Sequence, residues 1–137
     1  MKEIILQATK EDMQTVMNLL EKELKKSGCS ALLCMEFAIA FEELFVNIVH
    51  YAYEEDRGDV KLKYGLKKEK ERHTLKVELH DWGIAYNPLE KETPDISLSA
   101  KERKIGGLGI LMAKKFLNEI TYERVEGKNC LRFEKKF

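Results

Sequence analysis

A carboxylate and an amide lie one helical turn apart at Glu43 and Asn47, in a segment otherwise rich in apolar residues. Glu36 and His50 extend this polar set, because at about 100° per residue all four positions fall on one narrow stripe of a helix. Buried carboxylates and amides are costly unless paired, so the stripe either faces water or serves a site. In a site, the carboxylate could act as a base and the amide oxygen could bind a hard cation.

A second candidate group begins at Asp81, directly after an alternating apolar run, and continues as Asp81-Trp82-Gly83. An aspartate at the end of a strand can accept a hydrogen bond from an amino group. Gly83 would let a flat ligand approach the backbone, because glycine has no side chain. The same spacing also occurs in ordinary turns, so this pattern alone leaves both interpretations open.

Glycines form the third group, Gly106-Gly107-Leu108-Gly109, at the start of a predicted helix. Backbone N–H groups at a helix N-terminus can bind phosphate, and the helix dipole favours the negative charge. The spacing matches neither the dinucleotide-binding fingerprint nor the Walker motif. A hinge or a simple helix cap remains the alternative.

These residues need a scaffold, and the hydrophobic pattern predicts one α+β domain over residues 1–137. We expect a two-layer sandwich: a mostly antiparallel mixed sheet of about five strands, covered on one face by about three helices. The predicted strands cover residues 3–8, 60–66, 75–79, 119–125 and 130–136. The predicted helices run from the Thr9 cap to Gly28, from the Ser30 cap to about Tyr53, and over about 108–118. Residues 81–105 read as a long loop.

Composition narrows the classes of function. The chain of 137 residues has 24 Lys plus Arg and 24 Asp plus Glu, so it has no overall charge that would attract nucleic acid or anionic lipid. Because no run of about 18 apolar residues and no signal-peptide pattern is found, we expect no membrane span and no membrane partner. Three cysteines without a Cys-x-x-Cys motif, and three scattered histidines, predict a cytoplasmic protein without a disulfide scaffold or a zinc cluster.

Taken in order, the three motifs resemble the N, G1 and G2 boxes of the GHKL ATP-binding superfamily, which has the Bergerat fold. Glu43-Leu44-Phe45-Val46-Asn47-Ile48-Val49-His50-Tyr51-Ala52-Tyr53 is most similar to the corresponding segment of bacterial anti-sigma-factor serine/threonine kinases. The resemblance covers essentially the whole chain. It implies ATP or ADP and Mg²⁺ as cofactors.

The resemblance also implies a role for each matching residue. Glu43 would be the general base or would orient water, and Asn47 would bind magnesium. Asp81 would accept the adenine amino group, and Gly83 would pack against the base. Residues 89–105 would form a lid, and the phosphates would be wrapped by Gly106, Gly107, Leu108 and Gly109.

Two positions of the predicted nucleotide site depart from the family pattern. Ala85 replaces a common glycine, and Cys130 stands near the adenine where many relatives have threonine. A thiol is a poorer hydrogen-bonding group than a hydroxyl, so we expect a loss of about 1 kcal/mol in ATP affinity.

The resemblance implies a kinase that phosphorylates a Ser or Thr of a small anti-sigma-antagonist protein and controls a sigma factor by partner switching. The alternatives are an ATP-sensing binding module without kinase activity, a catalytic fragment of a histidine-kinase-like protein, and a structural protein without nucleotide. Relatives also suggest a homodimer through the face near the N-terminal strand and helix.

Overall fold

A computed structural model describes residues 1–53, 58–90 and 107–137. The strands are β1 (Lys2–Gln7), β2 (Asp59–Lys68), β3 (His73–Asp81), β4 (Glu119–Val125) and β5 (Lys128–Lys136). The helices are α1 (Lys10–Lys26), α2 (Ala31–Asn47) and α3 (Gly107–Phe116), with a π-helix at Ile48–Ala52 and a 3-10 turn at Pro88–Glu90.

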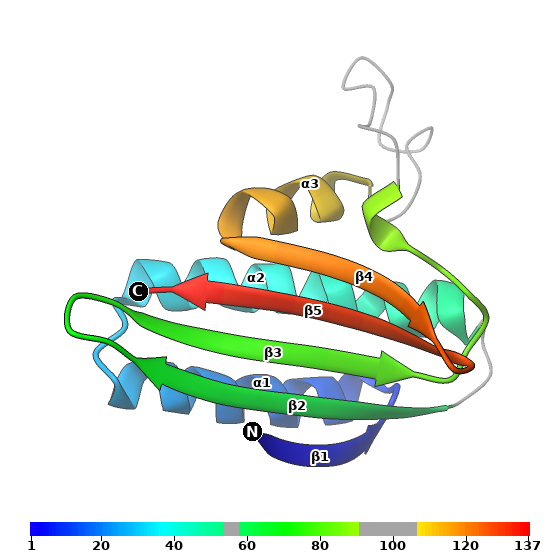
Figure 1. The fold of residues 1–137 in the computed structure, drawn as a ribbon, viewed down its shortest axis with the longest axis horizontal. Helices are drawn as coiled ribbons and strands as arrows, with labels where there is room; N and C mark the ends of the chain where they lie inside the picture. The colour runs from blue at the N-terminus through cyan, green and yellow to red at the C-terminus, as the bar shows by residue number, and fades with distance from the viewer. Residues whose placement is uncertain (54–57, 91–106) are drawn as a thin grey trace.

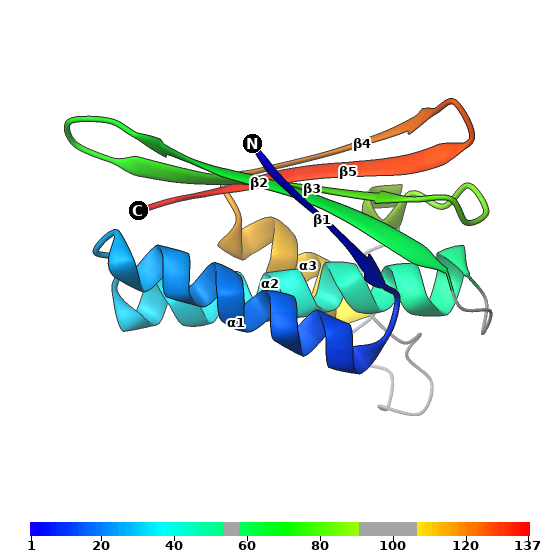
Figure 2. The same ribbon diagram turned by 90° about the horizontal axis from the view of Figure 1, so that it is seen from below.

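The five strands form one sheet in the order β1-β2-β3-β5-β4, and every pair of neighbours is antiparallel. All three α-helices lie on one face of this sheet, and the other face is open (Figure 2). The predicted two-layer α+β sandwich is confirmed. The described strands form a purely antiparallel sheet rather than a mixed one. No helix in these described ranges is long and apolar enough to cross a membrane.

The predicted caps begin the first two helices. The Thr9 side chain accepts a hydrogen bond from the Asp12 amide at 3.2 Å, and the Ser30 side chain accepts one from the Leu33 amide at 3.2 Å. Such caps satisfy N–H groups that have no partner within the helix. Gly28 follows α1 with φ of +90°, a conformation that favours glycine. Local side-chain chemistry therefore sets these boundaries.

Helix α2 is the central element of the helical layer, between α1 and α3 (Figure 1). Its Phe37, Phe41 and Phe45 have no exposed surface. The rings of Phe37 and Phe41 each lie 6.4 Å from that of Phe133 in β5, which joins α2 to the sheet. The prediction that this helix is buried is confirmed, and its polar residues therefore need partners or a ligand.

The α-helical geometry of this segment ends at Asn47, and one π-helical turn follows. The Tyr53 amide donates to the Ile48 carbonyl at 3.2 Å, a five-residue spacing. His50 lies within this wider turn and is exposed. At the C-terminal end of the predicted polar stripe, His50 therefore faces water.

At the N-terminal end of the stripe, Glu36 serves the scaffold. Its carboxylate pairs with the Lys135 ammonium at 3.1 Å, and the same ammonium donates to the Phe116 carbonyl at 2.6 Å. Lys135 is only 5% exposed. These contacts tie α2, the end of α3 and β5 together.

We expect Lys135→Met to lower the free energy of unfolding by roughly 1–3 kcal/mol. The substitution leaves Glu36 and a helix-terminal carbonyl unpaired. The effect should be smaller than for a fully buried pair, because the Glu36 side chain is 23% exposed. Urea unfolding measures it, with the exposed neighbour Lys136→Met as the control. Equal midpoints for the two variants would show that the buried pair does not stabilise the fold.

Candidate functional site

Asn47 ends α2 with one half of its amide unsatisfied. The residue is 2% exposed, and its Nδ2 donates to the Glu43 carbonyl at 2.6 Å. Its Oδ1 is buried and has no hydrogen-bond partner among residues 1–53, 58–90 and 107–137. An unpaired buried oxygen costs about 1–3 kcal/mol. An oxygen in this state suits a hard cation as ligand.

Glu43 lies against the first turn of α3. A Cβ built on Gly109 would overlap the Glu43 carboxylate, so glycine at this position lets α3 approach α2 closely. The structure thus brings Glu43 of the first motif next to Gly109 of the glycine-rich motif, although the two are far apart in the sequence. The carboxylate lies where backbone N–H groups at the start of α3 lack helical partners.

The rest of the glycine-rich motif is partly described. Gly107 begins α3, and Leu108 follows with 39% of its surface exposed. Gly106 and most of the predicted lid, residues 91–105, lie outside the described residues. At the start of the lid segment, the Lys114 ammonium donates to the Leu89 carbonyl at 3.1 Å.

Asp81 ends β3 as a buried acceptor, 2% exposed. Its Oδ1 accepts hydrogen bonds from the Gly83 amide at 3.0 Å and from Asn129 Nδ2 at 2.8 Å. Burial raises the pKa of the Asp81 carboxyl above its ordinary value, and these two hydrogen bonds oppose that rise. Because both groups donate to Oδ1, the direction of the other carboxylate oxygen, Oδ2, is fixed.

Gly83 is required by the scaffold itself. A Cβ at this position would overlap the Ala52 carbonyl, and the Ile84 amide donates to that same carbonyl at 2.9 Å. The end of the π-helix is thereby joined to the loop after β3. Contact between Gly83 and a flat ligand stays a prediction. Ala85, next in this loop, is exposed.

Asn129 is a residue that the sequence analysis missed. Its Nδ2 donates to Asp81 and, at 2.8 Å, to the Ile84 carbonyl. Its Oδ1 accepts from the Tyr86 amide at 3.2 Å and from the Tyr122 hydroxyl at 2.5 Å. All four hydrogen-bonding capacities are used. Only the β3–β5 register, which pairs residue 81 with residue 129, reveals this role.

Cys130 does not lie beside Asp81, which corrects the expectation for this position. Its Sγ is 3.4 Å from His80 Nε2, on the open face of the sheet. Neighbouring residues of a strand point to opposite faces, so Asn129 and not Cys130 reaches the helical side. The position that pairs with Asp81 across the sheet is therefore filled by an amide.

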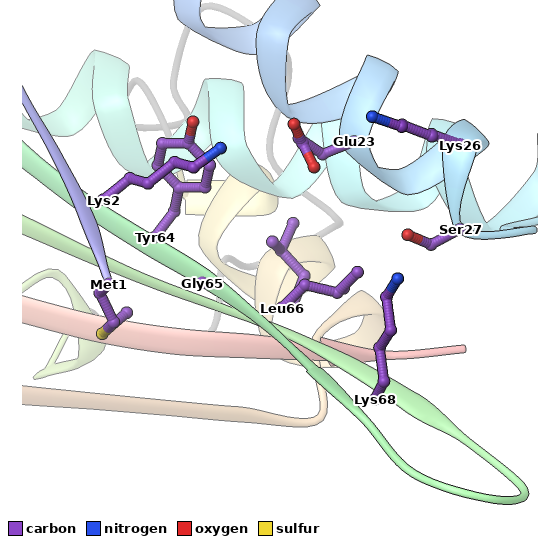
Figure 3. A pocket seen from close by; sticks show the side chains of 10 residues that line it. Met1, Lys2, Glu23, Lys26, Ser27, Tyr64, Gly65, Leu66 and Lys68 are labelled. Atoms are coloured by element: carbon purple, nitrogen blue, oxygen red, sulfur yellow. The ribbon is translucent and has the colours of Figure 1, made fainter.

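The end of α2, the end of β3 and the start of β5 meet at one end of the molecule, on the right of Figure 1. A pocket at the other end lies between α1 and β2 (Figure 3). Flexible charged side chains line it, including Lys2, Glu23, Lys26 and Lys68, and it contains none of the predicted site residues. We therefore place the candidate site at the α2–β3–α3 junction.

This junction offers three kinds of chemistry. Asp81 supplies a fixed acceptor for an amino group, Asn47 supplies an oxygen for a cation, and the α3 N-terminus supplies N–H groups for an anion. Glu43 adds a carboxylate beside the anion position. A ligand that carries both an amino-bearing ring and phosphates fits these groups, and the Glu43 carboxylate suits proton removal during group transfer.

The sequence of this chain is similar to a known family and to known proteins. A family model described as the histidine kinase-like ATPase domain matches residues 6–135. The chain is 29% identical over 100 residues to serine-protein kinase RsbW of Bacillus cereus (strain AH187), covering 70% of this chain and 60% of that protein. It is 26% identical over 102 residues to serine/threonine-protein kinase BtrW of Bordetella bronchiseptica, covering 74% and 70% of the two chains. The chain thus spans about 60% of the length of the RsbW relatives.

Proposed function

The chain belongs to the family of histidine kinase-like ATPase domains, and from this we propose that it binds ATP or ADP with Mg²⁺ at the α2–β3–α3 junction. The observation that carries the proposal is the buried Asn47 Oδ1, which has no hydrogen-bond partner within the ranges described. A cation ligand would satisfy this oxygen. The residues present therefore fit the metal that the family implies.

Each part of the nucleotide has a matching group. The Asp81 carboxylate would accept the adenine amino group through the oxygen that Asn129 and Gly83 leave free. The first turn of α3, from Gly107, would contact the phosphates. Asn47 would hold Mg²⁺, and the metal would neutralise charge that develops on the transferring phosphoryl group. Cys130 has no place in this proposal.

We further propose that the protein is a serine/threonine kinase. Its substrate would be a small anti-sigma-antagonist protein, and its second partner a sigma factor that is bound or released accordingly. Two observations support kinase activity: the similarity to proteins named serine-protein kinase, and the Glu43 carboxylate against α3. An ATP-sensing module that only binds partners would not need that carboxylate, so Glu43 separates the two functions.

Nucleotide binding is tested by thermal unfolding. ATP or ADP with Mg²⁺, at 100 times its Kd, should stabilise the protein by about 2.7 kcal/mol and raise the Tm. Asn47→Ala should remove mainly the magnesium-dependent part of this increase. Asn18→Ala, an exposed amide on α1, is the matched control. A wild-type Tm that stays constant at millimolar nucleotide would contradict the proposal.

A further inference from the structure

Three potential metal ligands meet on the open face of the sheet, opposite the helices. Glu78 Oε1 lies 3.0 Å from His80 Nε2, and Cys130 Sγ lies 3.4 Å from that nitrogen and 3.9 Å from that oxygen. His80 and Cys130 are directly paired across β3 and β5, and Glu78 precedes His80 by two residues on the same face. The pairing of strands, rather than closeness in sequence, therefore assembles this group.

The group is buried on a face of the sheet that carries no helix. His80 is 3% exposed and Cys130 is 1% exposed, while the Glu78 side chain is 21% exposed and gives access from solvent. Burial lowers the pKa of His80, which favours the neutral imidazole that binds metals. The Cys130 thiol is free of any disulfide. A buried histidine and thiol beside a carboxylate need a structural or a ligand-binding explanation.

We propose that Glu78, His80 and Cys130 bind a divalent zinc-class ion. With zinc bonds of about 2.0–2.3 Å, tetrahedral ligand atoms lie about 3.3–3.6 Å apart, so the observed separations need shifts of only a few tenths of an ångström. Thiolate, imidazole and carboxylate are the ligand types that zinc takes in proteins. The open side at Glu78 leaves the fourth position to water.

Charge also favours a dication. The thiol proton would pass to solvent on binding, so one thiolate and one carboxylate would balance the two positive charges of the ion. Arg132 Nε donates to Glu78 Oε1 at 3.2 Å, but its NH1 also donates to Glu123 at 3.1 Å. Glu123 can therefore retain this guanidinium when Glu78 takes the metal.

Two features near the site affect its affinity for a metal ion: the neighbouring lysines, and the Nδ1 atom of His80. The ammonium groups of Lys61 and Lys63 each lie 3.4 Å from a carboxylate oxygen of Glu3 and form ion pairs with it. His80 Nδ1 is buried without a hydrogen-bond partner in the part of the chain that the structure describes. Metal-binding histidines usually have such a partner, and its loss weakens binding. We therefore expect an exchangeable metal rather than one that is required for folding.

The inference is independent of nucleotide binding and is tested with Co²⁺ as a probe for Zn²⁺. Titrating the metal-free full chain with Co²⁺ should give one bound ion per chain. A thiolate-to-cobalt charge-transfer band and intense visible bands of a tetrahedral ion should appear, and Zn²⁺ should remove both. Cys130→Ser, which is nearly isosteric, should abolish the charge-transfer band. His80→Gln and Glu78→Gln should each weaken binding by at least roughly 10-fold.

Two control variants address the other thiols and another histidine. The double variant Cys29→Ser and Cys34→Ser removes the two other cysteines, and His73→Gln removes a histidine at the start of β3. Both should keep the cobalt spectrum and stoichiometry of the wild type. The proposal would be overturned by a charge-transfer band that persists in Cys130→Ser. It would also be overturned if the band were lost in the double variant Cys29→Ser and Cys34→Ser. A folded wild type that binds neither Co²⁺ nor Zn²⁺ would overturn it as well.

Discussion

Glu43→Gln should leave ATP bound but slow phosphoryl transfer to the antagonist protein by roughly 10²–10⁴-fold, the usual contribution of a general base. The substitution keeps the size of the side chain and removes its charge. A base acts mainly in the transition state, so ATP affinity should change by less than about 1 kcal/mol. Transfer of radiolabelled phosphate to a serine, together with ATP titration, measures both quantities.

Two further variants sharpen this test. Glu42→Gln removes an exposed carboxylate from the preceding position and should leave transfer unchanged. Gly109→Ala keeps Glu43 but places a methyl group where its carboxylate lies, so it should also slow transfer. Wild-type rates in Glu43→Gln would contradict the catalytic role. A wild type that binds ATP and partners but transfers no phosphate would favour the binding module.

Asp81→Asn should weaken ATP binding by about 1–3 kcal/mol, which is roughly 5–150-fold in Kd. The Gly83 amide and Asn129 Nδ2 both donate to Oδ1, so they select the orientation in which the new amide oxygen faces them. The new NH₂ group then points toward the adenine amino group, and two donors oppose each other. GTP carries a carbonyl at that position, so the variant should shift preference from ATP toward GTP.

Isothermal titration of both nucleotides against the wild type, Asp81→Asn and the exposed control Asp59→Asn measures this shift. The pH dependence gives a second measure. Burial raises the Asp81 pKa, and protonation replaces an acceptor with a donor. ATP affinity should therefore fall as pH is lowered through that raised pKa, and this loss should be absent in Asp81→Asn. Equal wild-type affinities for ATP and GTP would refute the role of Asp81.

Helices and strands were predictable where local chemistry determines them. The Thr9 and Ser30 caps begin α1 and α2 as predicted, and alternating apolar residues located β2 and β3. The motifs also led to residues that the fold brings together: Glu43 with Gly109, and Asp81 with Gly83.

What the sequence did not reveal depends on pairing between distant residues. A shift of one residue moves a side chain to the other face of a sheet, which is why Cys130 was expected where Asn129 lies. The same register brings Cys130 to His80, although the scattered histidines had argued against a zinc cluster. The pairing of Glu36 with Lys135, 99 residues later, likewise cannot be read from helical spacing.

The interior position of β5 in the sheet, between β3 and β4, has a consequence for synthesis on the ribosome. Strand β3 is made early, but its second neighbour is β5, near the end of the chain. Until β5 emerges, the nascent chain presents β3 as an unpaired edge that can pair with other chains. Asp81 also lacks Asn129 during this interval. A nascent chain that ends before β5 should therefore be prone to aggregation and unable to hold the Asp81 carboxylate in place.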